Sequence, residues 1–271
     1  MESINTPDSN QKISVSTLTN VPETMLIPLY FKAKETLEQG LIRDEKAVEI
    51  VNRIDYDFKK FDKDDKTQIG VVVRTFLFDK ILQDLYEKVG DKLVVVNLGA
   101  GLDTRQERFP GIKWYQLDLP ESIEIRKHFF EENKATLIAK SILDFSWIDD
   151  ISEKENVLFI GEGLFMYFEE DDVKAIFKSI GAHFSHSYIA FNPIPKLMVG
   201  TKHKSVDTSK APMLWGILSL KDVFDWNAGW KEVISYFPPD FFKRRWKGMS
   251  LLGILPGARK AFVIALLKTE K

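Results

Sequence analysis

Three short segments place glycines or acids directly after runs of apolar residues. In LVVVNLGAG the run ends at Gly99 and Gly101, in KWYQLD it ends at Asp118, and in NVLFIGEG Glu162 lies between two glycines. Glycine permits a tight turn and a close approach of the backbone to a ligand. A carboxylate behind an apolar strand is costly unless it faces a cleft or a partner. These residues are therefore the first candidates for a ligand site.

Asp118 follows Gly99 by 19 residues. In nucleotide-binding sheets an acid at about this spacing accepts hydrogen bonds from the ribose hydroxyls. A carboxylate has two acceptor oxygens, which match the two hydroxyls of a cis-diol. The alternative is a surface aspartate that ends a strand before Pro120. The glycine loop upstream favours the ribose contact.

The glycine loop differs from the dinucleotide fingerprint in its charge. The third glycine is absent, and Asp103 lies in the loop instead. This carboxylate would repel a pyrophosphate and attract a cationic ligand. A helix cap remains an alternative for Asp103. Glu162 is also a potential cap, but its strand is expected beside the first one, which favours contact with a cationic ligand.

Arg74 is the only charged residue within the apolar segment VVVRTFLF. Its side chain can extend to solvent, pair with Asp79, or bind a ligand carboxylate through two N–H groups. A ribose contact, acids near a cation and an arginine near a carboxylate together match S-adenosylmethionine. The residues therefore predict this cofactor in preference to a nicotinamide dinucleotide.

The elements that must position these residues alternate between strand and helix. Apolar runs predict five strands, at 93–101, 112–120, 135–143, 155–163 and 185–193, and two later ones, at 230–237 and 260–268. Helical patterns occupy 121–132 and 169–184, and three more precede the first strand, at 22–40, 42–54 and 67–90. This alternation is typical of an α/β fold with an open, mostly parallel sheet. We expect a helical cover over 1–90 and a Rossmann-like core over 91–271, with a lid insertion at about 196–232.

Composition excludes several classes of protein. The 271 residues include 38 basic and 40 acidic side chains, a net charge of −2, which argues against a general nucleic-acid binder. The absence of cysteine excludes disulfides, cysteine–zinc sites and thiol nucleophiles. No apolar run approaches the roughly 20 residues that span a bilayer. We expect a cytoplasmic protein that binds neither membrane nor nucleic acid, and we predict no metal site.

The combination of NLGAGLDTRQERF, WYQLDLPESIEIR and FIGEGLFMYF resembles the leucine carboxyl methyltransferase family, in particular its bacterial polyketide O-methyltransferase-like branch. The resemblance covers roughly residues 15–195. It implies a class I S-adenosylmethionine-dependent methyltransferase fold with a seven-stranded sheet and an N-terminal helical cover.

The resemblance also assigns roles to individual residues. It implies that Arg74 binds the methionyl carboxylate and that Glu162 lies near the cofactor. The remaining contacts that it implies are the methionyl part beside Gly99, Ala100 and Gly101, the ribose at Asp118 and Leu119, and the adenine beside Ser141 and Ile142. Many members have Asp-Leu in place of Ser141 and Ile142, so we consider Asp144 as a substitute. Lys32 lies where relatives often carry arginine.

The predicted reaction is methyl transfer from S-adenosyl-L-methionine to an oxygen, with S-adenosyl-L-homocysteine as the product. Such a displacement needs proximity and alignment. A carboxylate is ionised at neutral pH, whereas a phenol benefits from a base, and no histidine is convincingly placed as one. We therefore expect a carboxylate or phenol on a small apolar, polyketide-like acceptor. The alternatives are a nicotinamide-dinucleotide dehydrogenase and a catalytically silent binding module. The sequence leaves the oligomeric state open.

Overall fold

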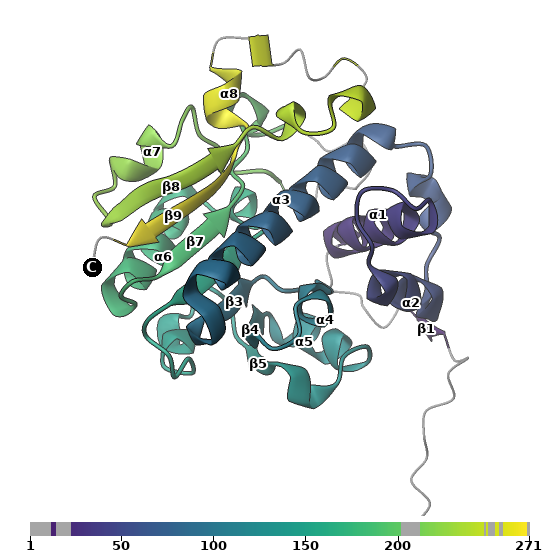
Figure 1. Cartoon of the computed structure of the whole chain (residues 1–271), viewed down its shortest axis with the longest axis horizontal. Helices are drawn as coiled ribbons and strands as arrows, with labels where there is room; N and C mark the ends of the chain where they lie inside the picture. The colour runs from purple at the N-terminus through teal and green to yellow at the C-terminus, as the bar shows by residue number, and fades with distance from the viewer. Residues whose placement is uncertain are drawn as a thin grey trace, which may run out of the picture.

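A seven-stranded sheet forms the centre of the molecule (Figure 1). The structure, a computed structural model, describes residues 12–14, 23–201, 212–246, 248, 253–254 and 257–269. The strands are β3 (Val94–Leu98), β4 (Lys113–Asp118), β5 (Thr136–Ala139), β6 (Val157–Gly161), β7 (Tyr188–Phe191), β8 (Trp230–Tyr236) and β9 (Ile264–Thr269). Their order is β5-β4-β3-β6-β7-β9-β8. The first five are parallel, and β9 runs antiparallel to both β7 and β8. The predicted seven-stranded, mostly parallel sheet is confirmed.

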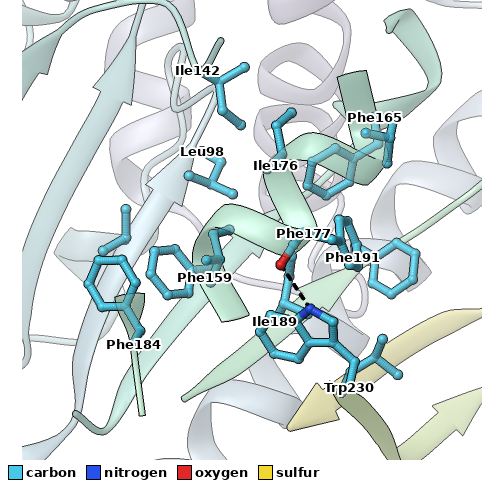
Figure 2. Packing of buried hydrophobic residues seen from close by; sticks show 14 of the residues in the cluster. Leu98, Ile142, Phe159, Phe165, Ile176, Phe177, Phe184, Ile189, Phe191 and Trp230 are labelled. Atoms are coloured by element: carbon cyan, nitrogen blue, oxygen red, sulfur yellow. Dashed lines mark hydrogen bonds between the residues drawn. The ribbon is translucent and has the colours of Figure 1, made fainter. Parts of the chain in front are cut away.

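Both faces of this sheet are covered, which explains the continuous apolar runs of its central strands. Every residue of β3 and β6 is buried. Successive side chains point to opposite faces, so Val96 and Phe159 pack on one face while Val95 and Leu158 pack on the other. Figure 2 shows part of the first face, where the Trp230 indole N–H donates to the Phe177 carbonyl oxygen at 3.0 Å.

Two long helices form the layers against the sheet. Helix α3 (Asp65–Val89) runs diagonally across one face (Figure 1), and its Val73, Leu77 and Ile81 pack on the sheet at a spacing of four residues. Helix α6 (Glu170–His183) packs on the opposite face. The shorter helices are α4 (Arg105–Arg108), α5 (Pro120–Lys127), α7 (Lys221–Phe224) and α8 (Ala258–Ala261).

Helices α1 (Leu26–Leu37) and α2 (Glu45–Arg53) lie together beside α3 (Figure 1). Their core residues pack against each other and against Ile125 and Phe129, at the end of α5. The predicted first helix ends at Leu37 rather than at Gly40. A short parallel pair, β1 (Ile13–Ser14) with β2 (Ile54–Asp55), adds strand structure that the sequence did not indicate.

The segment predicted to form a lid is anchored at its base. Pro195 and Ile217 form a β-bridge, and the Leu214 N–H donates to the Met166 carbonyl oxygen at 2.7 Å. Part of the predicted insertion, 202–211, including His203, lies outside the described residues. None of the helices within the described part of the chain has the length and apolar character needed to cross a bilayer.

Candidate active site

A cavity of about 600 Å³ opens at the carboxyl ends of the parallel strands. Parallel strands bring the loops that follow them to one edge of the sheet, which is where such sheets bind ligands. All of the residues predicted to contact the cofactor line this cavity: Arg74, Gly99, Ala100, Gly101, Asp118, Leu119, Ser141, Ile142 and Glu162. Helix α1 closes one side, and Met166 and Met213 contribute from the loop after β6 and from the insertion.

The glycine loop has a conformation that requires its first glycine. Gly99 has φ +62°, and a Cβ atom there would lie 2.6 Å from Cδ1 of Leu164. The loop is tied to the next strand because the Ala100 N–H donates to the Leu117 carbonyl oxygen at 3.1 Å. The backbone thus reaches the cavity without a side chain between it and a ligand.

Asp118 holds the same loop from the end of β4. Its Oδ2 accepts the Gly101 N–H at 2.7 Å, and its Oδ1 accepts the Leu119 N–H at 2.7 Å. Burial raises the pKa of Asp118, and these two N–H groups partly offset that rise. The Ser122 side chain also hydrogen-bonds to this carboxylate, which has about four acceptor sites, so an acceptor site remains for a ligand in the cavity.

Arg74 projects from α3 toward the loop after β6, and its Nε donates to Glu162 Oε1 at 2.8 Å. The alternative pairing with Asp79 is not what the structure shows, because Asp79 binds Arg105 and Arg108. A Cβ atom at Gly163 would lie 3.4 Å from Nη1 of Arg74, so this glycine makes room for the guanidinium. Among the described residues, Nη1 and Nη2 of Arg74 have no hydrogen-bond partner, which leaves both nitrogens for a ligand.

A charged cluster of four acids and four bases forms part of the cavity wall and extends behind it. Its members are Lys32, Asp44, Arg74, Asp79, Asp103, Arg105, Arg108 and Glu162. Burial alone would raise the pKa of Glu162, but Arg105 and then Arg74 lower it below its ordinary value. Burial acts in the same direction on Asp103, and Arg105 and Lys32 reverse the effect, so the pKa of Asp103 is also lowered. Both acids therefore carry negative charge at neutral pH.

Lys32 joins this cluster from helix α1. Its Nζ donates to the Thr104 hydroxyl at 3.1 Å and lies 3.6 Å from Asp103 Oδ1. The side chain is only 5% exposed, and Lys32 also lines the cavity. The structure thereby gives a location to a residue whose role the sequence left open.

Asp144 does not line the cavity. Its carboxylate accepts the Ser146 N–H at 3.1 Å and caps the 3₁₀ helix Phe145–Ile148. The proposed substitution for the missing family aspartate is therefore not supported by this geometry. Ser141 and Ile142 do line the cavity, and Ile142 is buried.

Sequence reasoning missed a buried polar chain beside the glycine loop. The Asn97 amide donates to Asp103 and to Gln116, and the Gln116 amide donates to Gln106. Arg126 completes the chain by donating to Gln106 Oε1 at 2.8 Å and to the Gly101 carbonyl oxygen at 3.0 Å. Burial lowers the pKa of Arg126 to about 10, so the side chain is still a cation at neutral pH. The sequence signal that could have predicted this chain is the pair of polar residues, Asn97 and Gln116, within otherwise apolar strands.

Histidines take no part in the cavity lining that the structure describes. His183 lies at the end of α6, where its Nδ1 is 2.8 Å from the Ser179 carbonyl oxygen. Within the described residues no group of three or more His, Cys, Asp or Glu side chains is arranged so that it could hold a metal ion.

Comparison with known proteins identifies the family. The model of the leucine carboxyl methyltransferase family matches residues 30–181, which is more than half of the chain. The chain is 28% identical over 182 residues to the tetracenomycin polyketide synthesis O-methyltransferase TcmP of Streptomyces glaucescens, covering 65% of this chain and 67% of TcmP. It is 26% identical over 190 residues to the S-adenosyl-L-methionine-dependent methyltransferase dpfgK of Gibberella zeae, covering 63% and 64%.

A solved structure shows the fold at greater sequence distance. A candidate methyltransferase from Thermobifida fusca superposes with a TM-score of 0.54 at 10% identity, over 89% of this chain and 94% of that one. The sheet order, the glycine loop and this likeness together define the class I methyltransferase fold. With the family match across its core, the chain belongs to the leucine carboxyl methyltransferase family.

Proposed function

We propose that this protein is an S-adenosylmethionine-dependent O-methyltransferase that acts on the carboxylate, or a phenol, of a small apolar acceptor. Family membership and fold support the methyltransferase activity. The observation that carries the proposal is the convergence of Asp118, Glu162 and Arg74 on one cavity beside the glycine loop. Their charges complement the groups of this cofactor one by one.

The residues of the cavity fit the cofactor by their chemistry. Asp118 offers acceptor oxygens to the ribose hydroxyls, and Gly99 lets backbone and ligand approach closely. Glu162 and Asp103 provide negative charge for the cationic amino and sulfonium groups. Nη1 and Nη2 of Arg74, which bond to none of the described residues, suit the methionyl carboxylate.

When bound, S-adenosylmethionine supplies a methyl group activated by the positive charge on sulfur. The chain's own contribution is to hold both reactants close and aligned, which can supply effective molarities of about 10⁵ M or more. Helix α1 and the anchored base of the insertion close the cavity from two sides.

The acceptor assignment rests on the lining of the cavity. Ile27, Pro28 and Leu29 of α1 and Met166 and Met213 opposite them present an apolar surface. A carboxylate needs no base at neutral pH, which agrees with the absence of histidine from the described lining. The name of TcmP, an O-methyltransferase of polyketide synthesis, supports an oxygen acceptor of this kind.

Calorimetric titration with S-adenosylhomocysteine, beside a nicotinamide dinucleotide, tests the cofactor. We expect a micromolar Kd, about −8 kcal/mol, for S-adenosylhomocysteine and no heat from the dinucleotide. The opposite pattern would indicate a dehydrogenase. No binding of either compound, in folded protein freed of carried-over ligand, would indicate a silent binding module.

A methyl-transfer assay then tests the acceptor. Pairs of aromatic carboxylic acids and phenols of matched size are offered with labelled S-adenosylmethionine, and ester and ether products are separated. Transfer to the acids with little transfer to the phenols supports the carboxylate. Transfer only to amines would overturn the oxygen assignment while leaving the methyltransferase activity in place.

A further inference from the structure

Arg105 holds three carboxylates at once. Its Nε donates to Asp79 Oδ1 at 2.7 Å, its Nη1 to Asp103 Oδ2 at 2.5 Å and its Nη2 to Glu162 Oε2 at 2.5 Å. The side chain is 1% exposed and is absent from the cavity lining. Arg105 therefore cannot touch a ligand directly, although two of its partners line the cavity.

The three carboxylates come from three separate parts of the fold. Asp79 belongs to α3, Asp103 to the loop after β3, and Glu162 to the loop after β6. The planar guanidinium fork is the side chain suited to this geometry, because a lysine ammonium has no fixed fork. Arg105 thus connects the two acidic loops of the cavity to the helix that carries Arg74.

We propose that Arg105 is the positioning residue that holds Asp103 and Glu162 in place and ionised, so that the cavity is ready for the cationic end of the cofactor. This inference rests on the proposed function. Asp103 and Glu162 are two like charges in a buried site, and each would otherwise favour the protonated form. The fork of Arg105 offsets this cost before any ligand enters.

The proposal predicts a specific dependence on pH. Arg105, Arg74 and Lys32 face Glu162 and lower its pKa, whereas burial and Asp103 raise it. Loss of Arg105 removes the strongest of the lowering influences, so Glu162 takes up a proton at a higher pH. Cofactor affinity then falls as the pH falls, because a neutral acid no longer attracts a cation.

The experiment measures S-adenosylhomocysteine affinity by calorimetry between pH 5.5 and pH 7.0, where the ligand's amino group stays protonated. Wild type is expected to vary less than about twofold over this range. Arg105→Gln is expected to bind about tenfold more weakly at pH 7.0, and about fivefold more weakly again at pH 5.5. Arg105→Lys keeps the charge but loses the planar fork, so its affinity should lie between those of wild type and Arg105→Gln.

Arg108→Gln is the matched control. Arg108 also pairs with Asp79 from the same helix but has no bond to Asp103 or Glu162. Its affinity should stay within about threefold of wild type and vary with pH less than that of Arg105→Gln, because Arg108 lowers the pKa of Asp103 less than Arg105 and Lys32 do. Thermal unfolding establishes that each variant is folded.

The outcomes separate this inference from the proposed function. A pH-independent loss of affinity in Arg105→Gln, equal to the loss in Arg108→Gln, would mean a merely structural role and would overturn the proposal. If Arg105→Gln does not fold, Arg105→Lys is used instead, and a pH-independent loss equal to that in Arg108→Gln would again overturn the proposal. Failure of wild type to bind S-adenosylhomocysteine would overturn the proposed function itself.

Discussion

In the proposed function, Asp118 combines a structural and a binding role in one carboxylate. It fixes the glycine loop through the Gly101 N–H, and it also lines the cavity. Arg74 is similar, since its Nε donates to Glu162 while its two Nη atoms bond to none of the described residues. We therefore infer that single side chains at this site both build the pocket and bind the ligand.

Replacing Asp118 with Asn tests this double role. We expect S-adenosylhomocysteine affinity to fall at least about tenfold, because an amide loses the charge and one of the two acceptor atoms. Asp144→Asn is the matched control, an exposed aspartate that caps a short helix away from the cavity. Its affinity should stay within about twofold of wild type. Equal affinities for the two variants, measured by calorimetry, would remove Asp118 from the binding site.

At the scale of elements, a glycine in a turn and a glycine in a helix differ in the space around them. Gly99 lies in a positive-φ turn with Leu164 against it, whereas a Cβ atom at Gly70, within α3, would meet nothing within 4 Å. We expect Gly99→Ala to weaken S-adenosylhomocysteine binding more than tenfold and to cost roughly 1–3 kcal/mol of unfolding free energy. Urea denaturation and calorimetry together measure both effects.

Gly70→Ala is the counterpart in the helix. Alanine is the better helix former, so the unfolding free energy should rise by about 0.5–1 kcal/mol. A loss of stability in this variant would show that the turn of α3 beside Arg74 is more crowded than the structure indicates.

Most of the strands and helices could be predicted from the sequence. Parallel strands buried on both faces require continuous apolar runs, so segments such as VVVNL and VLFIG stand out from their surroundings. The end of α1 was less visible, because the chain passes Leu37 and continues to Gly40 without a strong stop signal. The pair β1–β2 is too short to produce a pattern.

Only part of the candidate site could be predicted from the sequence, and the reason is physical. The topology rule places the lining residues that follow strands, but it does not place Arg74, which comes from α3. The partners of Arg105 come from three elements, and no spacing in the sequence encodes their meeting. The same limit applies to Asn97 and Gln116, which looked like isolated polar residues within apolar strands.

At the scale of the whole molecule, one ion pair joins regions 210 residues apart in the chain. Glu35 of α1 is fully buried and is bound by Arg245 of the 3₁₀ helix Lys243–Trp246, by the Leu41 N–H and by Gln68. Two residues of the basic and aromatic segment 241–246 therefore make internal contacts: Arg245 binds Glu35, and Trp246 is buried.

Acid should therefore unfold the protein at a pH that depends on Arg245. Burial raises the pKa of Glu35, but Arg245 and the other donors lower it below its ordinary value. A lowered pKa stabilises the fold above the ordinary value, about 4.3, and this stabilisation is lost as the pH falls below it. In Arg245→Met the burial effect remains, so Glu35 should take up a proton at a higher pH.

Urea denaturation at pH 7.0 and at pH 4.5 measures this shift. We expect Arg245→Met to lose about 2 kcal/mol at pH 7.0, less than for a fully buried pair because Arg245 is one-third exposed. The difference from wild type should shrink at pH 4.5. A constant difference at both pH values would mean that the pair does not control the ionisation of Glu35.

Because β9 lies between β7 and β8, the described sheet cannot be completed until β9 has been synthesised. Strand β8 leaves the ribosome before β9, yet its only neighbour in the described sheet is β9. Until β9 emerges, the buried strand β7 presents an unpaired edge, and Val233 and Ile234 of β8 stay without a partner strand. The nascent chain thus carries two unpaired edges at once, and β9, the last strand of the described sheet, pairs with both.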